Sequence, residues 1–447
     1  MLKKLLLSLI LPSLVLIFKP LGLSLGQSIV LATLIFTITN WTTRAIKSIY
    51  VSTLLLIIFM IFGNTPFDRI FSFLLSDSFI LILFSFIFSQ GISNSLLAEK
   101  LFYPLIGKYV KNVYQLLISI LLSAFVLIFV IPQPISRVIM LSFIFNEYFK
   151  KIGIEGSLQE ILMFSTMAFS TFLQSIFKRA DILLSTSALS LADISMTEAE
   201  WVRYMTVPSI LMVTLGVSLF IFVYRDDLKK FDSTILSNEN SKIVLDKNDK
   251  KNLLLIGLIV ILWATEGIHH IRGSIIVVIG TILMYFRGII VKKDLKTVNV
   301  TLLVFLTAVM SIGAVMKGSG IADIVFGSFT RIFPKEFSAF YIFIIIITTM
   351  SLHMILGSNL TSMSVVIPGI MTITAGIVEP TILMFLVFVS LFSHYLLSVH
   401  STIFAMGVGY GYFSSKTVTR FGLVTTPFVL ISIYCFFIPW WKLIGVL

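Results

Sequence analysis

A cluster of small hydroxyl and amide residues interrupts an apolar run in the second half of the chain. The stretch LHMILGSNLTSMSVVIPGI holds Ser358, Asn359, Thr361, Ser362 and Ser364. The oxygens of the first three suit a hard cation such as sodium, and the amide hydrogens at the start of the next helix can hold an anion. A helix–helix contact through small polar residues is the competing interpretation, because such contacts are common in membranes.

Two further places carry residues that can bind an anion. His400, Ser401 and Thr402 lie in LLSVHSTIFAMGVGYGYF, where a histidine can bind substrate or carry a proton. Arg137 follows Ser136 in QPISRVIML, and its planar guanidinium can pair with a carboxylate, sulfate or phosphate. A histidine buried by packing and an arginine at the base of a hairpin are the alternatives.

A third polar segment, TFLQSIFKRADIL, places Lys178 and Arg179 in an otherwise apolar region. Ionisable residues at membrane depth are candidates for function by default. At a membrane interface they can instead extend their charged ends into water. The sequence leaves both interpretations open.

The composition explains why these polar clusters stand out. Of 447 residues, 57% are hydrophobic and 12% are charged, with a mean hydropathy of +1.05, whereas soluble proteins carry roughly 25% charged residues. The net charge of +12 indicates lysines in cytoplasmic loops rather than nucleic-acid binding. The single cysteine, Cys435, excludes a disulfide framework. No H-E-x-x-H or G-x-x-x-x-G-K-[ST] motif occurs, so neither an enzyme nor an ATP-driven pump is expected.

Apolar segments recur from end to end, and a membrane span takes about 20 residues. The predicted apolar segments are 5–18, 27–41, 49–62, 78–89, 116–131, 135–149, 161–176, 207–224, 253–265, 274–285, 302–316, 340–356, 358–374, 381–397 and 424–438. An amphipathic stretch is predicted at 98–113. The polar stretch 226–252 is predicted to be an exposed cytoplasmic linker without regular structure.

The two halves of the chain repeat each other. NSLLAEKLF at 94–102 corresponds to GSGIADIVF at 318–326, and the same shift places Ser358–Asn359 on Pro134–Ile135. The predicted division is an N-terminal span at 1–20, a first repeat at 21–225 with a hairpin at about 114–149, the linker, and a second repeat at 253–447 with a hairpin at about 338–374.

The lysines set the predicted topology. With a cytoplasmic N-terminus, the basic loops fall on one side if six spans precede the linker and five follow it. An odd number of spans in each repeat makes the repeats inverted. The predicted fold is therefore an all-α polytopic membrane protein of about 11 spans, with two inverted repeats of about five transmembrane helices plus a re-entrant hairpin each. Its expected place is the inner or plasma membrane.

Several segments, taken in order, resemble the divalent anion/sodium symporter family of the ion-transporter superfamily. They are WATEGI, AVMKGSGIAD, LLSAFV, GSNLTSMSVVIP and the C-terminal GYGYFSSKTVTRFGL with PWWKLIGVL. The resemblance implies a homodimer that moves dicarboxylates, citrate, sulfate or similar anions by an elevator motion, often with sodium. It also implies that two Ser-Asn-Thr hairpins, with the loops after the following spans, hold sodium and substrate.

The second hairpin motif of the family is partly present. Ser358 and Asn359 match it, Leu360 stands where its threonine is expected, and Thr361 follows one place late. The segment VHSTIF matches the loop that completes this site. The resemblance therefore implies Ser358, Asn359 and Ser401 as sodium ligands.

The first half departs from the family pattern. LLSAFV is followed by LIFVIPQPISR without Ser-Asn-Thr, and LQSIFKRADIL replaces the expected glycine-rich loop. The first sodium site is therefore expected to be lost, with the cations Arg137, Lys178 and Arg179 nearby. A fixed positive charge can neutralise a dianion without a co-transported ion.

These observations favour a secondary active transporter of a small divalent anion, either a di- or tricarboxylate, sulfate or phosphate. Elevator-type alternating access is expected, with sodium as the one ion that is bound besides the substrate and with no other cofactor. Two alternatives stay open: a sodium-independent anion exchanger that uses Arg137 and His400 in place of sodium, and a non-transporting relative with a decayed site. The expected partners are the anion, the lipid bilayer and a second copy of the chain, and no nucleic acid.

Overall fold

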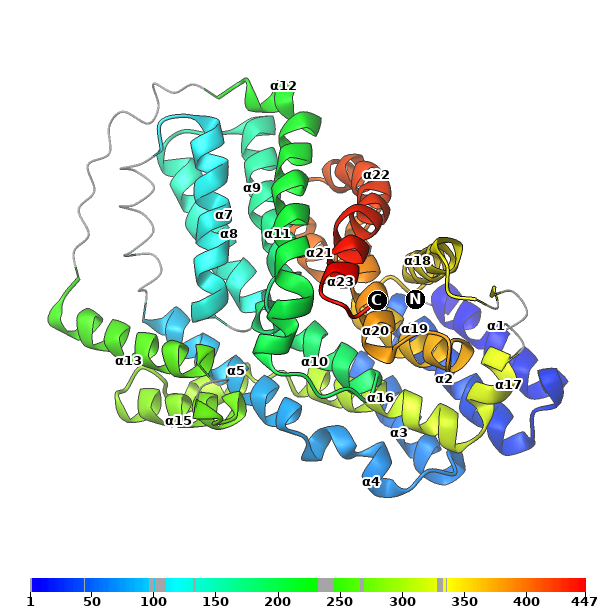
Figure 1. Cartoon of the computed structure of the whole chain (residues 1–447). Helices are drawn as coiled ribbons and strands as arrows, with labels where there is room; N and C mark the ends of the chain where they lie inside the picture. Colours follow the sequence, from blue (N-terminus) through cyan, green and yellow to red (C-terminus); the bar gives the residue numbers. More distant parts are fainter. Residues whose placement is uncertain are drawn as a thin grey trace. The chain divides into compact units, whose positions relative to one another are not determined.

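The computed structural model describes residues 2–43, 45–95, 100, 110–131, 134–231, 245–265, 269–327, 333, 334 and 336–447. Within these ranges the regular structure is helical throughout, without a strand (Figure 1). The predicted all-α class is therefore confirmed. The stretches NSLLAEKLF, WATEGI and 98–113 lie largely outside the described residues.

Long apolar helices support a polytopic membrane protein. In the described part, four stretches are long and apolar enough to cross a membrane: α11 (Glu198–Val223), α16 (Val300–Gly318), α18 (Ala339–Leu356) and the continuous stretch Ser415–Leu443. Eight shorter apolar helices accompany them in the same described ranges. The side chains of Ile17 and Phe286 are 71% and 80% exposed, as expected of surfaces that face lipid. The total of about 11 spans and the inverted repeats stay predictions.

The chain forms two compact units, and each is assembled from three segments. Unit 1 consists of Met1–Phe79, Thr186–Ser195 and Asn299–Leu391. Unit 2 consists of Ile80–Ser185, Met196–Val298 and Phe392–Leu447. Segments that are far apart in the sequence therefore share one packed interior in each unit.

Unit 1 is built on consecutive helices near the N-terminus and on the hairpin of the second half. Its helices include α1 (Leu2–Phe18), α2 (Leu25–Thr43), α3 (Ser48–Phe62), α4 (Phe67–Ile70), α16, α17 (Ile321–Gly327), α18 and α19 (Asn359–Ile373). Trp41 joins three of them, because its Nε1 donates to Ser52 Oγ at 3.0 Å and its ring lies 4.7 Å from that of Phe305. α16 also packs against α19 and thereby supports the hairpin.

Unit 2 packs helices of both halves of the chain around aromatic side chains. Its helices α7 (Val113–Val130), α8 (Pro134–Lys151), α9 (Gly156–Phe172) and α11 lie side by side (Figure 1). The ring of Phe164 lies 5.9 Å from Phe220, 5.4 Å from Phe404 and 5.9 Å from Phe421. Edge-to-face and tilted aromatic contacts of this kind hold the three segments together.

Two predicted apolar segments end earlier than the sequence pattern suggested. Segment 161–176 leaves the α-helix at Phe172 and continues through the tight turns η3 (Leu173–Ser175) and η4 (Lys178–Asp181) into α10 (Ile182–Leu191). The carbonyls of Ser175 and Ile176 accept from Trp201 Nε1 at 3.0 Å and from Thr206 Oγ1 at 2.7 Å. Side chains of α11 thus replace the helical hydrogen bonds at this break.

The second break lies in the predicted segment 381–397. α20 (Pro380–Phe392) ends five residues early, and the chain continues through η7 (Ser398–His400) to the short helix α21 (Thr402–Gly409). The backbone amides of Leu396 and Leu397 donate to His400 Nδ1 instead of to helical carbonyls. The first break is therefore held by hydrogen bonds from the distant helix α11 and the second by the local side chain of His400, and an apolar pattern encodes neither.

The polar linker has helices at both ends, so the prediction of an irregular loop over 226–252 is wrong there. α12 (Arg225–Leu228) follows α11, and α13 (Lys247–Ala264) begins where Asp246 Oδ1 accepts from the amide of Asp249 at 2.7 Å. Residues 232–244 lie outside the described part. Among the described residues, the remaining helices of eight or more residues are α5 (Asp77–Asn94), α15 (Gly273–Phe286) and α22 (Ser415–Ser432). α22 continues through η8 (Ile433–Phe437) into α23 (Ile438–Leu443).

Candidate functional site

The hairpin predicted at 338–374 is a tight turn between α18 and α19 in unit 1. Only Gly357 and Ser358 connect the two helices. Gly357 has φ +66°, a left-handed conformation that favours glycine at a helix C-terminus, and its amide donates to His353 at 2.8 Å. α19 then starts with the hydrogen bond from Ser362 N to Ser358 O at 2.8 Å. The polar cluster of the sequence therefore sits at the tip of the hairpin.

Two buried acceptor atoms at this tip lack a hydrogen-bond partner among the described residues. They are Asn359 Oδ1 and Ser362 Oγ. Ser364 differs, because its hydroxyl donates to Thr361 O at 2.7 Å. Leaving buried polar atoms unsatisfied costs about 1–3 kcal/mol each, and hard cations prefer oxygen ligands. The geometry of the tip therefore suits a cation such as sodium at Asn359.

Arg137 lies near the break between α7 and α8, in unit 2. It lies in the first turn of α8 and is only 1% exposed. Its Nη1 donates to Ile131 O at 3.1 Å, at the end of α7, and its Nη2 donates to Ala180 O at 2.5 Å, in η4. Its Nε has no partner among the described residues. One guanidinium thus joins the hairpin break to the break after α9, while the side chain of the neighbouring Ser136 lies outside the described part.

Four further ionisable side chains lie on or beside η4. Arg179 Nε lies 3.5 Å from Glu198 Oε2, and the arginine side chain is only 4% exposed. Lys178 Nζ donates to Met196 O at 2.6 Å. Asp181 Oδ1 accepts from the amide of Leu184 at 3.0 Å and is 3% exposed. Because Arg179 is buried in an ion pair, it does not extend its charge to a surface.

The sequence analysis named Lys178 and Arg179 but missed Asp181 and Glu198. The available signal was the string KRAD, in which an acid directly follows two bases within an apolar region. Carboxylates in such regions are rare and deserve the same attention as cations. Glu198 gave no such signal, because it lies in a polar stretch before the apolar part of α11.

The loop of His400 is also in unit 2, where its imidazole shapes the loop itself. His400 is 4% exposed, and its Nδ1 accepts from Leu396 N and Leu397 N, each at 3.3 Å. Ser401 precedes α21 as its half-buried N-cap residue without a side-chain capping bond, and Thr402 is exposed. The structure therefore places Ser401 at the start of a helix, where its hydroxyl does not cap the backbone.

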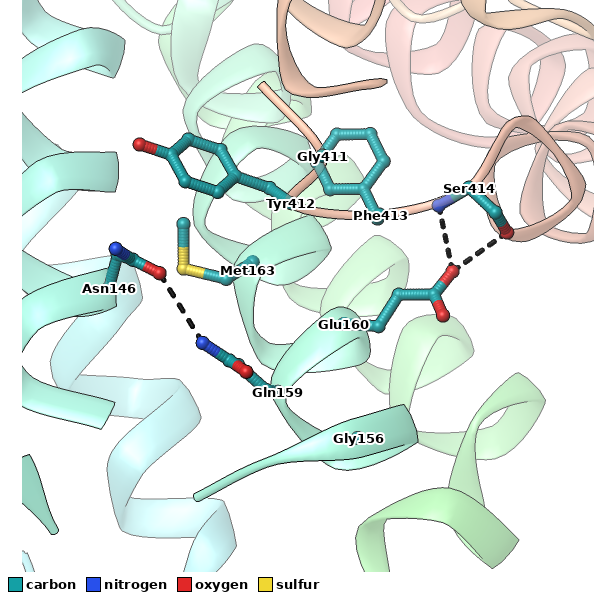
Figure 2. Close-up of a pocket in the computed structure, with 9 residues that line it drawn as sticks. All are labelled: Asn146, Gly156, Gln159, Glu160, Met163, Gly411, Tyr412, Phe413 and Ser414. Atoms are coloured by element: carbon teal, nitrogen blue, oxygen red, sulfur yellow. Dashed lines mark hydrogen bonds between the residues drawn. The ribbon is translucent and has the colours of Figure 1, made fainter. Parts of the chain in front are cut away.

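A separate cavity of about 520 Å³ lies at another place in unit 2 (Figure 2). Asn146, Gln159, Glu160, Tyr412 and Ser414 contribute to its lining. Gln159 Nε2 donates to Asn146 Oδ1 at 3.3 Å, across the ends of α8 and α9. None of the residues predicted for substrate binding lines this cavity.

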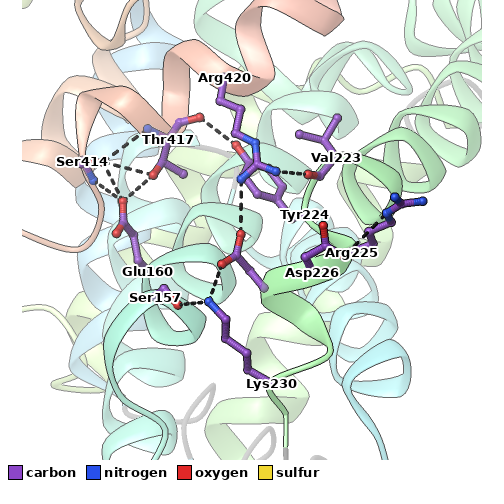
Figure 3. A network of polar contacts seen from close by, with 11 residues as sticks. Ser157, Glu160, Val223, Tyr224, Arg225, Asp226, Lys230, Ser414, Thr417 and Arg420 are labelled. Atoms are coloured by element: carbon purple, nitrogen blue, oxygen red, sulfur yellow. Dashed lines mark hydrogen bonds and ion pairs between the residues drawn. The ribbon is translucent and has the colours of Figure 1, made fainter.

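Polar contacts beside the cavity hold helix ends together (Figure 3). Glu160 Oε1 accepts from the amide and the hydroxyl of Ser414, each at 2.8 Å, and from the hydroxyl of Thr417. Asp227 accepts from Lys230 at 2.9 Å and from Arg420 at 3.3 Å. These contacts join the starts of α9 and α22 to α12, so we assign them to stability rather than to substrate binding.

Comparison with known proteins identifies the family of the chain. No curated protein matches the sequence. A family model described as the transmembrane region of sodium:sulfate symporters, however, matches residues 1–447. Since this match covers the whole sequence, from α1 through both breaks to α23, the chain belongs to the sodium:sulfate symporter family.

Proposed function

We propose that this protein is a secondary active transporter of a small divalent anion, either a di- or tricarboxylate, sulfate or phosphate, that works by elevator-type alternating access. Membership in the family indicates anion transport across a membrane. The observation that carries the choice of a dianion is Arg137, whose buried guanidinium lies between two helix breaks. Broken helices are where secondary transporters bind their substrates.

The surroundings of Arg137 suit it to attract an anion. Its two hydrogen bonds end on the neutral carbonyls of Ile131 and Ala180, which fix the guanidinium without cancelling its charge. In a poorly polarisable interior such a charge acts more strongly than in water. The charge of Arg137 is therefore left for an ionised group to balance, and a divalent substrate can take this role during transport.

Sodium is the proposed coupling ion at the hairpin tip of unit 1. Asn359 Oδ1 is an open acceptor there, and Ser358 and Thr361 bring further oxygens to the same turn. The second candidate function is a sodium-independent exchanger. The buried charge of Arg137 favours it, because a fixed cation removes the need for one sodium ion.

Uptake into proteoliposomes tests the proposal. Purified protein is reconstituted, and entry of labelled succinate and labelled sulfate is measured with and without an inward sodium gradient, and with and without the same unlabelled anion inside. Stimulation by sodium supports the symporter, and uptake that needs only internal anion supports the exchanger. If none of these conditions gives uptake of succinate, citrate, sulfate or phosphate, the proposal fails in favour of a non-transporting relative.

A further inference from the structure

Asp181 is a buried acid beside the cation of the proposed site. It is 3% exposed and lies where η4 passes into α10. Arg137 Nη2 binds the carbonyl of Ala180, the residue directly before it, at 2.5 Å. Asp181 therefore follows directly on the residue whose carbonyl holds the Arg137 guanidinium. Neither the family match nor the proposed function assigns a role to this carboxylate.

The other charged groups around η4 are already engaged with each other or with the backbone. On η4 itself, Lys178 binds Met196 O and Arg179 pairs with Glu198, which belongs to the adjacent α11. The helix α7 packs against η4 as well, and it contains no charged residue. Arg137, from α8, is therefore the cation that Asp181 compensates.

We propose that Asp181 binds a proton together with the anion, so that a proton accompanies the substrate through the transport cycle. Without substrate, the carboxylate of Asp181 balances Arg137. When a dianion arrives, its negative charge disfavours the ionised carboxylate. A proton taken up from the solvent then forms an O–H bond on Asp181, and the net charge of the Arg137–Asp181 pair rises from zero to one positive charge.

Release reverses this step on the other side of the membrane. The anion leaves, the O–H bond of Asp181 breaks, and the proton passes to water while the carboxylate again balances Arg137. Intramembrane carboxylates serve as proton relays in other transporters, so the chemistry has a physical precedent. The inference rests on the proposed anion transport and adds the proton as a co-substrate.

The test is uptake driven by a pH gradient. Proteoliposomes with an alkaline interior are compared with liposomes without a gradient at the same external pH, with the membrane potential clamped by potassium and valinomycin. Labelled sulfate is the first probe, because it stays a dianion throughout the neutral range, so that titration of the substrate cannot imitate the effect. Labelled succinate is the second probe.

We expect the gradient to accelerate uptake severalfold in the wild type and not at all in Asp181→Asn, which keeps the size of the side chain but cannot ionise. Glu198→Gln is the matched control, since it removes another acid, partly buried beside η4, and should leave the response to the gradient in place. A gradient response that persists in Asp181→Asn would overturn the proposal.

A direct measurement keeps the proposal testable if Asp181→Asn does not fold. A pH-sensitive dye inside wild-type proteoliposomes should report acidification that accompanies sulfate or succinate entry under the same voltage clamp. Anion uptake without acidification and without a gradient response refutes the role of Asp181 while the proposed anion transport stands. Absence of any anion uptake refutes the proposed function itself.

Discussion

Arg137 is held by backbone carbonyls at both of its terminal nitrogens. Such hydrogen bonds have a demanding geometry, because the two acceptors, Ile131 O and Ala180 O, belong to different breaks of the chain. A lysine presents a single ammonium group and cannot reproduce the planar fork. Substitutions can therefore separate two contributions of Arg137, its positive charge and its hydrogen bonds to the two carbonyls.

We expect Arg137→Gln to abolish uptake of a dianion and Arg137→Lys to retain a measurable part of it. Each lost hydrogen bond to the charged group costs about 1.5–3 kcal/mol, so both variants should unfold at lower temperature in detergent. Uptake is measured per amount of protein that remains monodisperse in size-exclusion chromatography. If both variants are destabilised to a similar extent, a difference between their uptake rates then reports the effect of the charge at position 137.

Arg203→Gln is the control for this experiment. Its guanidinium donates to Ile444 O at 3.3 Å from an exposed position on α11. Uptake should stay near the wild-type rate. Wild-type uptake by Arg137→Gln would remove Arg137 from the transport mechanism.

At the scale of the elements, Gly422 lets α22 approach the loop that follows α20. A Cβ at this position would lie 2.3 Å from Tyr395 O and 3.0 Å from Leu396 Cα, both in the backbone of that loop. Backbone atoms cannot rotate away as a side chain does. The contact therefore requires glycine and fixes the loop that contains His400.

Gly422→Ala should accordingly destabilise the protein by about 1–3 kcal/mol, the usual cost of overpacking. Gly409→Ala is the matched control, since nothing lies within 4 Å of a Cβ built there at the end of α21. The thermal midpoint in detergent is the measurement. Equal thermal midpoints for the two variants would show that the loop after α20 accommodates the added methyl group without loss of stability.

The stability that Asp227 contributes through its contacts with Lys230 and Arg420 should decrease in acid. The hydrogen bond from Lys230 holds the pKa of the Asp227 carboxyl below its ordinary value, and Arg420 acts in the same direction. A carboxyl with a depressed folded pKa stabilises the fold fully above the unfolded pKa of about 3.9, and this stabilisation is lost as the pH falls through the folded pKa.

Asp227→Asn should therefore lower the thermal midpoint at neutral pH, by an amount that reflects about 1 kcal/mol or less. The difference in thermal midpoint between variant and wild type should disappear as the pH is lowered. Asp226→Asn serves as the control, because Asp226 is 71% exposed and its ion pairs with Arg225 and Lys229 are longer, at 3.7 and 3.6 Å. A gap that stays constant with pH would contradict the assignment to Asp227.

At the scale of the whole molecule, the two units are each compact, and elevator transport predicts that distances between them change during the cycle. Leu75 in unit 1 and Lys229 in unit 2 are exposed and can carry spin labels as cysteines. The native Cys435 is exposed and is first replaced by serine. Lys229 with Leu443 forms a control pair inside unit 2.

Double electron–electron resonance should give a distance distribution between positions 75 and 229 that shifts on addition of sodium and anion. The pair 229 and 443 should keep its distribution, because both labels belong to one packed unit. Identical distributions for the first pair in all conditions would argue against an elevator motion. A shift in the control pair would instead indicate rearrangement within unit 2.

Local sequence determined the class of this protein and the place of its polar turn. Continuous apolar segments in a chain with 12% charged residues must be kept from water by lipid or by each other. A helix pairs the backbone hydrogen-bonding groups within one segment, so such segments favour helices in a membrane. Glycine before Ser358 marks the end of α18, because the left-handed turn there favours glycine. The hairpin tip at Ser358 and Asn359 could therefore be read from neighbouring residues alone.

Tertiary structure alone decided what the buried charges do. The ion pair of Arg179 with Glu198 and the hydrogen bond from Arg137 to the carbonyl of Ala180 join residues that are separated in sequence. The early end of α9 has the same origin, because the side chain of Trp201 in α11 binds a carbonyl of the segment that follows it. The sequence pattern shows how apolar each segment is. A charged side chain is stable in the interior only when polar or oppositely charged groups contact it, and only the folded chain brings such distant groups together.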